Sequence, residues 1–154
     1  MDTQKELRKH LLELLAGKSA HISLETVLRE FPVDKINVRL ENAPHTAWEL
    51  LEHLRIAQWD IVEFSLDEKH ISPKFPDGLW NKKEGAAKNW QKSCRQVLDD
   101  LQRMRDLVSD EKTDMFAEIP HGDGQTVFRE ALLIADHNAY HLGQIAFLMR
   151  TLEK

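Results

Sequence analysis

The sequence is poor in the features typical of secreted, membrane and nucleic-acid-binding proteins. Its 154 residues include one cysteine, Cys94, so neither an internal disulfide nor a cluster of thiolate metal ligands can form. We therefore expect a reducing, cytoplasmic setting. Apolar runs are only a few residues long, against the roughly 20 residues that a bilayer span requires, so we expect no membrane association. The formal net charge is −5 and no basic stripe is present, so we expect no nucleic-acid partner.

What the sequence does contain is a series of amphipathic helical patterns. An apolar fraction of 42% and a charged fraction of 31% are ordinary for a globular protein, and the length suits one domain over residues 1–154. Apolar residues recur every three or four positions over 3–16, 24–31, 46–66, 84–109 and from Gln125 or Thr126 onward. No segment alternates convincingly as a strand. The pattern predicts an all-α protein, a four-helix bundle with one short additional helix.

Local signals predict where several of these helices begin and end. Thr46 and Glu49 have the spacing of a capping box, in which each side chain accepts a hydrogen bond from the other residue's backbone N–H. Ser23 can cap the short helix, and Gly17 is a suitable stop for the first one. The predicted buried stripe of the first helix consists of Leu7, Leu11, Leu14 and Leu15.

Residues 67–83 interrupt the helical pattern with a long loop. The loop contains two prolines together with Phe75, Leu79 and Trp80, which a flexible linker would not need. We expect a structured loop that covers one end of the bundle or lines a substrate pocket. Simple packing over the core is the alternative for each of these side chains.

Two histidines lie one helical turn apart in the last predicted helix. His137 and His141 are about 6 Å apart along the helix axis, beside a buried stripe that includes Asn138. Buried imidazoles need polar partners, and one metal ion would satisfy both, because this spacing points them at a common position. Hydrogen bonds to neighbouring groups, without a metal, are the alternative.

A third histidine, His53, lies at the edge of the apolar stripe of the 46–66 helix. Three imidazoles would leave open positions on a divalent ion, as in a catalytic site, and they suit Zn, Ni, Cu or Fe, with affinity alone favouring the later first-row metals. Two known patterns are absent. No Glu-x-x-His motif of a di-iron bundle precedes these histidines, and Asn138 stands where a zincin would have its glutamate.

Two other polar residues lie on the same helix faces as these histidines. Asp60 and Gln144 each follow a histidine by two turns and are candidates to orient a ligand, with solvation or helix packing as the alternatives. Cys94 falls on a buried stripe and is predicted to be a core residue, not a nucleophile. The remaining histidines lie outside the stripes and are predicted to be surface or loop residues: His10, His21, His45, His70 and His121.

The segments at residues 43–54 (APHTAWELLEHL) and 136–144 (DHNAYHLGQ) resemble the DinB-like (DinB/YfiT) family. That family consists of bacterial metal-binding four-helix bundles, and the resemblance extends over nearly the whole chain. It implies that His53, His137 and His141 match the family's three metal-binding histidines. Some relatives are thiol S-transferases or isomerases that use a low-molecular-weight bacterial thiol, others have been called hydrolases, and many have no known activity.

Three functions follow from the residues and the resemblance. We favour a metal-dependent thiol S-transferase of stress or detoxification metabolism, with one divalent ion per chain and a small thiol as co-substrate. A metal-dependent hydrolase and a non-catalytic metal-binding stress or regulatory module are the alternatives. We expect a small-molecule substrate and a homodimer. The sequence assigns no catalytic residue beyond the metal site.

Overall fold

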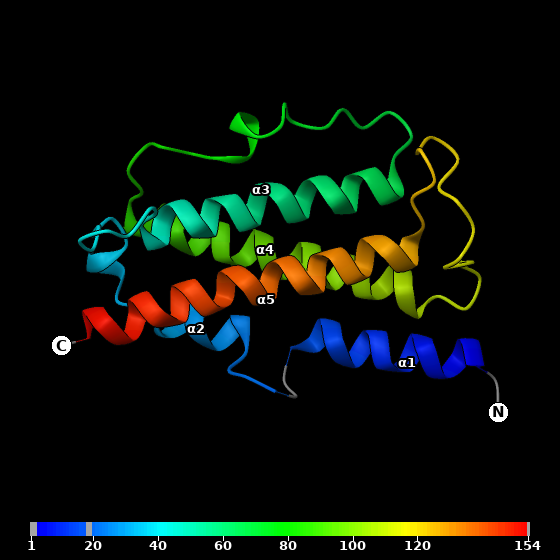
Figure 1. Ribbon diagram of the computed structural model, residues 1–154, viewed down its shortest axis with the longest axis horizontal. Helices are drawn as coiled ribbons and strands as arrows, with labels where there is room; N and C mark the ends of the chain where they lie inside the picture. The colour runs from blue at the N-terminus through cyan, green and yellow to red at the C-terminus, as the bar shows by residue number, and fades with distance from the viewer. Residues whose placement is uncertain (1–2, 18–19, 154) are drawn as a thin grey trace.

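The computed structural model describes residues 3–17 and 20–153 and confirms the all-α prediction (Figure 1). Its α-helices are α1 (Thr3–Ala16), α2 (Leu24–Glu30), α3 (Ala47–Leu66), α4 (Ala87–Ser109) and α5 (Val127–Leu152), with short 3-10 turns η1 (Val33–Lys35) and η2 (Asp77–Leu79). The described residues contain no strand, only an isolated bridge between Glu118 and Thr126. None of the helices in this part of the chain combines the length and apolar character needed to cross a membrane.

The helices form a bundle in which α1 and α2 lie one after the other and together occupy the position of a single helix. α3, α4 and α5 run side by side, while α1 and α2 follow one another along the same side of the molecule (Figure 1). Both α1 and α2 pack against α4 and α5. The short helix predicted in addition to the four main helices is α2. It continues along the side of the bundle that α1 begins.

The capping and stop signals predicted at three helix ends are present in the structure. The Thr46 hydroxyl accepts from the Glu49 backbone N–H and the Glu49 carboxylate accepts from the Thr46 N–H, so the capping box is present. Ser23 caps α2 through the Thr26 N–H. Gly17 ends α1 with a positive φ of 59°, a conformation that a glycine adopts without strain.

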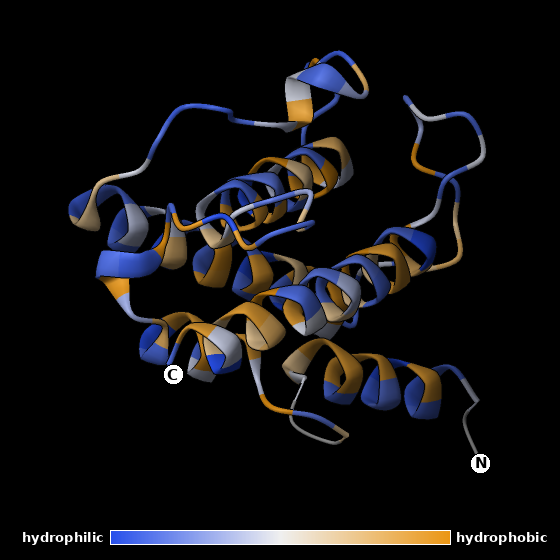
Figure 2. Ribbon diagram, turned by 60° about the vertical axis from the view of Figure 1, so that its left-hand side comes forward, coloured by the Kyte–Doolittle hydropathy of each residue, from blue (hydrophilic) through white to orange (hydrophobic). Residues whose placement is uncertain are grey.

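Two expectations about the helices need correction. α4 begins at Ala87 instead of residue 84, because the preceding residues pass over α3, where the Lys83 carbonyl accepts from the Trp48 indole. On α1, Leu11 and Leu15 are buried, but Leu7 is 38% and Leu14 52% exposed. The physical reason is that α1 is an outer helix against α4 and α5, so only a narrow stripe is covered. Figure 2 shows this division, with the hydrophobic side of α1 turned toward the other helices.

The hydrophobic core is divided into two clusters along the bundle. One cluster includes Leu54 and Leu142, and the other includes Val62 and Ile134. Between these levels lie two buried amides, Gln58 on α3 and Asn138 on α5.

These two amides connect the three longest helices. The Asn138 amide nitrogen donates to Gln58 Oε1 at 2.7 Å, and Gln58 Nε2 donates to the backbone carbonyl of Val97 on α4. The Val97 carbonyl can only accept, so the orientation of both amides follows from it. The Asn138 Oδ1 atom is buried and has no hydrogen-bond partner among the described residues.

Removing both amides of this pair is expected to destabilise the fold by less than the sum of the two single removals. Asn138→Leu leaves Gln58 Oε1 buried without a donor, and we expect a loss of about 1–3 kcal/mol in the free energy of unfolding. Gln58→Met should have a similar effect. The double variant replaces both polar groups, so its loss should be clearly smaller than the sum of the single losses. Urea unfolding of the four proteins measures this coupling, and strictly additive losses would contradict it.

The single thiol belongs to the core, as predicted. Cys94 on α4 packs partly buried against the first hydrophobic cluster, and this burial raises the pKa of the thiol to about 12. At pH 8 its thiolate fraction is therefore on the order of a thousandfold smaller than that of a free cysteine. We expect Ellman's reagent to label the native protein at least about a hundredfold more slowly than the same protein in guanidinium. Similar rates in the two states would show an accessible, ionisable thiol.

Candidate metal centre

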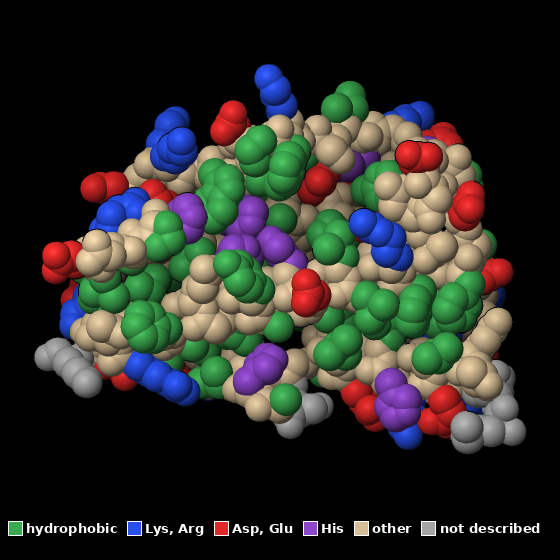
Figure 3. Space-filling view, viewed as in Figure 1, with side chains coloured by type: hydrophobic (Ala, Val, Ile, Leu, Met, Phe, Trp, Pro, Cys, Tyr) green, Lys and Arg blue, Asp and Glu red, His purple; other side chains and the backbone are tan. Residues whose placement is uncertain are grey.

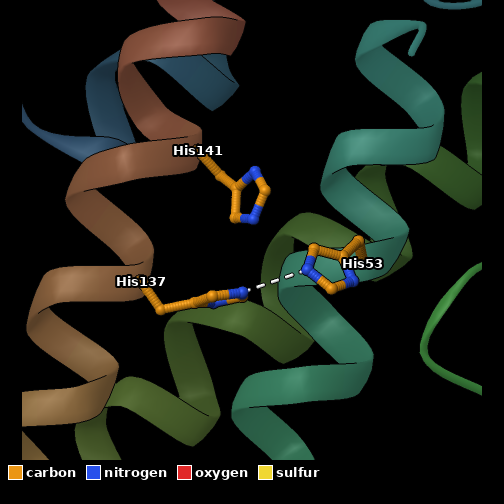
Figure 4. A group of neighbouring side chains, drawn as sticks. All are labelled: His53, His137 and His141. Atoms are coloured by element: carbon orange, nitrogen blue, oxygen red, sulfur yellow. Dashed lines mark hydrogen bonds between the residues drawn. The ribbon is translucent and has the colours of Figure 1, made fainter. Parts of the chain in front are cut away.

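The structure brings together the three histidines singled out in the sequence. His53 projects from α3, and His137 and His141 project from successive turns of α5 toward the same space between the helices (Figure 4). One ring nitrogen from each lies within 4.8 Å of the other two. His53 Nε2 and His137 Nε2 are 3.0 Å apart. We call these three residues the histidine cluster.

Hydrogen bonds on the outer side of two rings orient them. His53 Nδ1 lies 3.0 Å from the carbonyl oxygen of Leu79, which can only accept a proton. His141 Nδ1 lies 2.7 Å from Gln144 Oε1. Both contacts assign the proton to Nδ1, so the Nε2 lone pairs of His53 and His141 face the interior of the cluster, where His53 Nε2 accepts a hydrogen bond from His137 Nε2. Gln144 therefore contacts His141, one turn before it, and not His137, two turns before it.

Trp80 covers one side of the cluster. Its ring stacks on His53 with centroids 4.0 Å apart and planes 3° apart, and its other face stacks on His45 at 4.1 Å. Leu79 and Trp80 both belong to the 67–83 loop, which runs alongside α3 (Figure 1). The loop therefore helps to build the site. Phe75, however, is 80% exposed and makes no such contribution.

The environment of the cluster keeps its imidazoles uncharged. Burial lowers the pKa of His53, His137 and His141, and in His137 the neighbouring His141 and His53 add to the effect. The pKa of His137 falls to about 4. All three rings are thus neutral at pH 7, the state in which imidazole binds a metal ion.

Asp60 does not join the cluster. Its carboxylate oxygen lies 2.6 Å from His70 Nε2, and the His70 ring also meets the edge of Trp59. Seven residues correspond to about 10.5 Å along a helix, so Asp60 is too far along α3 to contact the His53 ring directly. His70 was predicted to be a surface or loop residue. It does lie in the loop, but its side chain is only 7% exposed.

Glu52, the acidic residue next to His53, is also hydrogen-bonded to groups outside the cluster. Glu52 is buried and accepts hydrogen bonds from Arg55, Ser93 on α4 and Asn81 in the 67–83 loop. Burial alone would raise the pKa of Glu52, but these hydrogen bonds outweigh it and hold the pKa below its ordinary value. Glu52 therefore stays ionised and joins α3, α4 and the loop behind the cluster.

The cluster has the properties of an open metal site. Figure 3 shows histidine side chains gathered in a hollow on one face of the molecule, bordered by hydrophobic side chains. His53 and His141 are each 7% exposed, so access is narrow. Three neutral imidazoles with convergent ring nitrogens fit a divalent transition-metal ion and would leave coordination positions for another ligand.

The sequence predicted the cluster, and it predicted that the loop containing Trp80 covers one end of the bundle or lines a pocket, but it did not predict that Trp80 and His45 stack beside His53. His45 and Trp80 lie in connecting segments where no periodicity indicates what they face. The one available signal for Trp80 was that it is a large apolar residue in a loop that contains two prolines.

Comparison with known proteins agrees with this description of the fold and the site. A sequence model of the DinB superfamily matches residues 18–145, a span that includes the three histidines and Gln144. No match was found among curated proteins or among solved structures. Because the family match covers most of the chain and the fold is the expected helical bundle, the protein belongs to the DinB superfamily.

Proposed function

We propose that His53, His137 and His141 bind one divalent transition-metal ion, and that the protein is a metal-dependent thiol S-transferase. Its co-substrate is a low-molecular-weight thiol, and its role lies in stress or detoxification metabolism. The observation that carries the proposal is the convergence of three neutral imidazoles whose outer nitrogens are already hydrogen-bonded in two cases. A divalent ion with open positions would supply Lewis acidity that favours the deprotonated form of a thiol or of water.

The protein's own residues provide orientation and exclude solvent. The Leu79 carbonyl and Gln144 hold two of the rings with their Nε2 atoms facing inward. Trp80 lies flat against His53 and keeps water from that face. In the proposed transfer the thiol loses its proton to solvent and its sulfur bonds to an electrophilic carbon. The leaving group departs with the electron pair of the bond that breaks.

The surroundings of the cluster favour a thiol over water as the nucleophile. Hydrolysis commonly uses a carboxylate as a general base. The acidic residues of α3 around His53 are all hydrogen-bonded to other groups: Glu49 to Arg39 and the Thr46 N–H, Glu52 to Ser93 and Asp60 to His70. Asn138, between the two histidines of α5, cannot accept a proton in this way. A thiol has a pKa near 8.5 and needs less assistance than water to ionise.

Metal content should depend on each histidine of the cluster. We expect His53→Ala, His137→Ala and His141→Ala to weaken metal binding well beyond about tenfold, and Gln144→Leu to weaken it by about tenfold, because Gln144 orients His141. His10→Ala changes an exposed histidine of α1 and is the matched control. Metal analysis after dialysis against a weak chelator measures occupancy. Full occupancy in both His53→Ala and His137→Ala would contradict the assignment.

Thiol transfer should require both the metal and the cluster. Metal-loaded protein is incubated with cysteine or another small thiol and 1-chloro-2,4-dinitrobenzene, and thioether formation is followed by absorbance. We expect turnover that disappears on metal removal and in His141→Ala. In cobalt-substituted protein, titration with the thiol should also produce an intense near-ultraviolet charge-transfer band.

The same preparations distinguish the alternative functions. Hydrolysis of ester and amide panels without thiol would support the hydrolase. No reaction in either assay, together with no cobalt band at thiol concentrations well above millimolar, would reject the transferase and leave the non-catalytic metal-binding module.

A further inference from the structure

A second feature of the surface lies beside the histidine cluster. An apolar groove of about 480 Å³ runs between the segment at residues 40–45 and the C-terminal half of α5. This volume is within the range of small-molecule sites, about 300–1,000 Å³. We call it the α5 groove, and its apolar lining includes Leu40, Pro44, Leu50, Tyr140, Phe147 and Leu148.

A glycine inside a long helix keeps this groove open. Gly143 lies in the middle of α5 and lines the groove, although glycine is unfavourable in a helix interior. Tyr140 and Phe147, about one turn to either side, are each 66% exposed. Gly143 therefore forms the open floor between two exposed aromatic rings.

The groove adjoins the histidine cluster through lining side chains that contact the cluster or its cover, Trp80. Gln144 lines the groove and is hydrogen-bonded to His141. The Tyr140 ring is 4.9 Å from the His141 ring. On the opposite wall, His45 stacks on Trp80, which covers His53. A molecule in the groove would thus lie one side chain away from the cluster.

We propose that the α5 groove binds the apolar ring or chain of the electrophilic substrate. This inference rests on the proposed transferase function and assigns its substrate class: a small electrophile with a reactive carbon attached to an aromatic or alkyl group. The groove suits such a group because its polar lining is confined to Glu41, Asn42, His45 and Gln144, and Tyr140 and Phe147 offer ring faces for contact. A small thiol needs no apolar groove of this size.

Binding to the groove can be tested without metal or turnover. The neutral fluorescent probe N-phenyl-1-naphthylamine is titrated into metal-free protein. We expect saturable binding to the wild type and at least tenfold weaker binding to Gly143→Leu, whose side chain would occupy the groove. Gly143→Ala should have a smaller effect. Thr151→Leu adds bulk at an exposed position of α5 two turns beyond Gly143 and should bind the probe like the wild type.

The Gly143→Leu variant should fold normally, because its β-carbon meets no other atom and leucine is a better helix former than glycine. Circular dichroism checks this. Equal probe affinity in the wild type and in Gly143→Leu would overturn the proposal. So would sedimentation data showing that Gly143→Leu separates a wild-type dimer without changing probe affinity, since the groove would then hold a second copy of the chain.

Selectivity in the transfer assay supplies the second measurement. We expect Gly143→Leu to lower the ratio of kcat/KM for 1-chloro-2,4-dinitrobenzene to kcat/KM for iodoacetamide by at least tenfold. An unchanged ratio would overturn the assignment of the substrate class. If neither electrophile reacts with the wild type, the transferase function fails, while probe binding still decides whether the groove accepts an apolar ligand.

Discussion

The hydrogen bond between Asn138 and Gln58 is the constraint on which the arrangement of the site depends. It lies between two hydrophobic clusters, where an unpaired amide would be costly, and Gln58 extends it to the Val97 carbonyl on α4. Apolar side chains alone allow helices to slide by small amounts, whereas this pair forms in one register. Asn138 stands between His137 and His141 on α5, and Gln58 follows His53 on α3. The register that satisfies the amides is therefore the one that sets the histidines of α5 opposite His53.

The polar groups around the histidine cluster are of two kinds. Some are hydrogen-bonded to the histidine rings, and the others are hydrogen-bonded to groups outside the cluster. The Leu79 carbonyl and Gln144 act on the rings themselves and direct their Nε2 atoms inward. Glu52 and Asp60, which could have placed negative charge near the cluster, are bound to Arg55, Ser93, Asn81 and His70 instead. The cluster is consequently a neutral set of nitrogen donors. Such a set leaves the charge of a bound divalent ion uncompensated, which favours an anionic exogenous ligand such as a thiolate.

The connecting segments contribute as much to the site as the helices do. The 67–83 loop supplies Leu79 and Trp80 to His53 and Asn81 to Glu52, and the segment before α3 supplies His45 to Trp80 and Leu40 and Pro44 to the α5 groove. The helices thereby hold the nitrogen donors at fixed distances, while the loops shape the space in front of them. In the proposed function, the bundle provides the metal site and the loops provide the surface that selects the substrate.

The sequence by itself determined the features that depend on the backbone within one or two helical turns. The capping box at Thr46 and Glu49, the stop at Gly17 and the one-turn spacing of His137 and His141 are of this kind, because helix geometry converts sequence separation directly into position. Helical periodicity likewise placed His53 on an inward side of α3. Only the tertiary structure decided which groups these side chains meet. The partners of Asp60, Glu52 and His53 lie in a loop or on another helix, and nothing in the local pattern predicts the path of a loop across the surface. Contacts of that kind arise from the packing of the whole chain, so they become visible only when the fold is known.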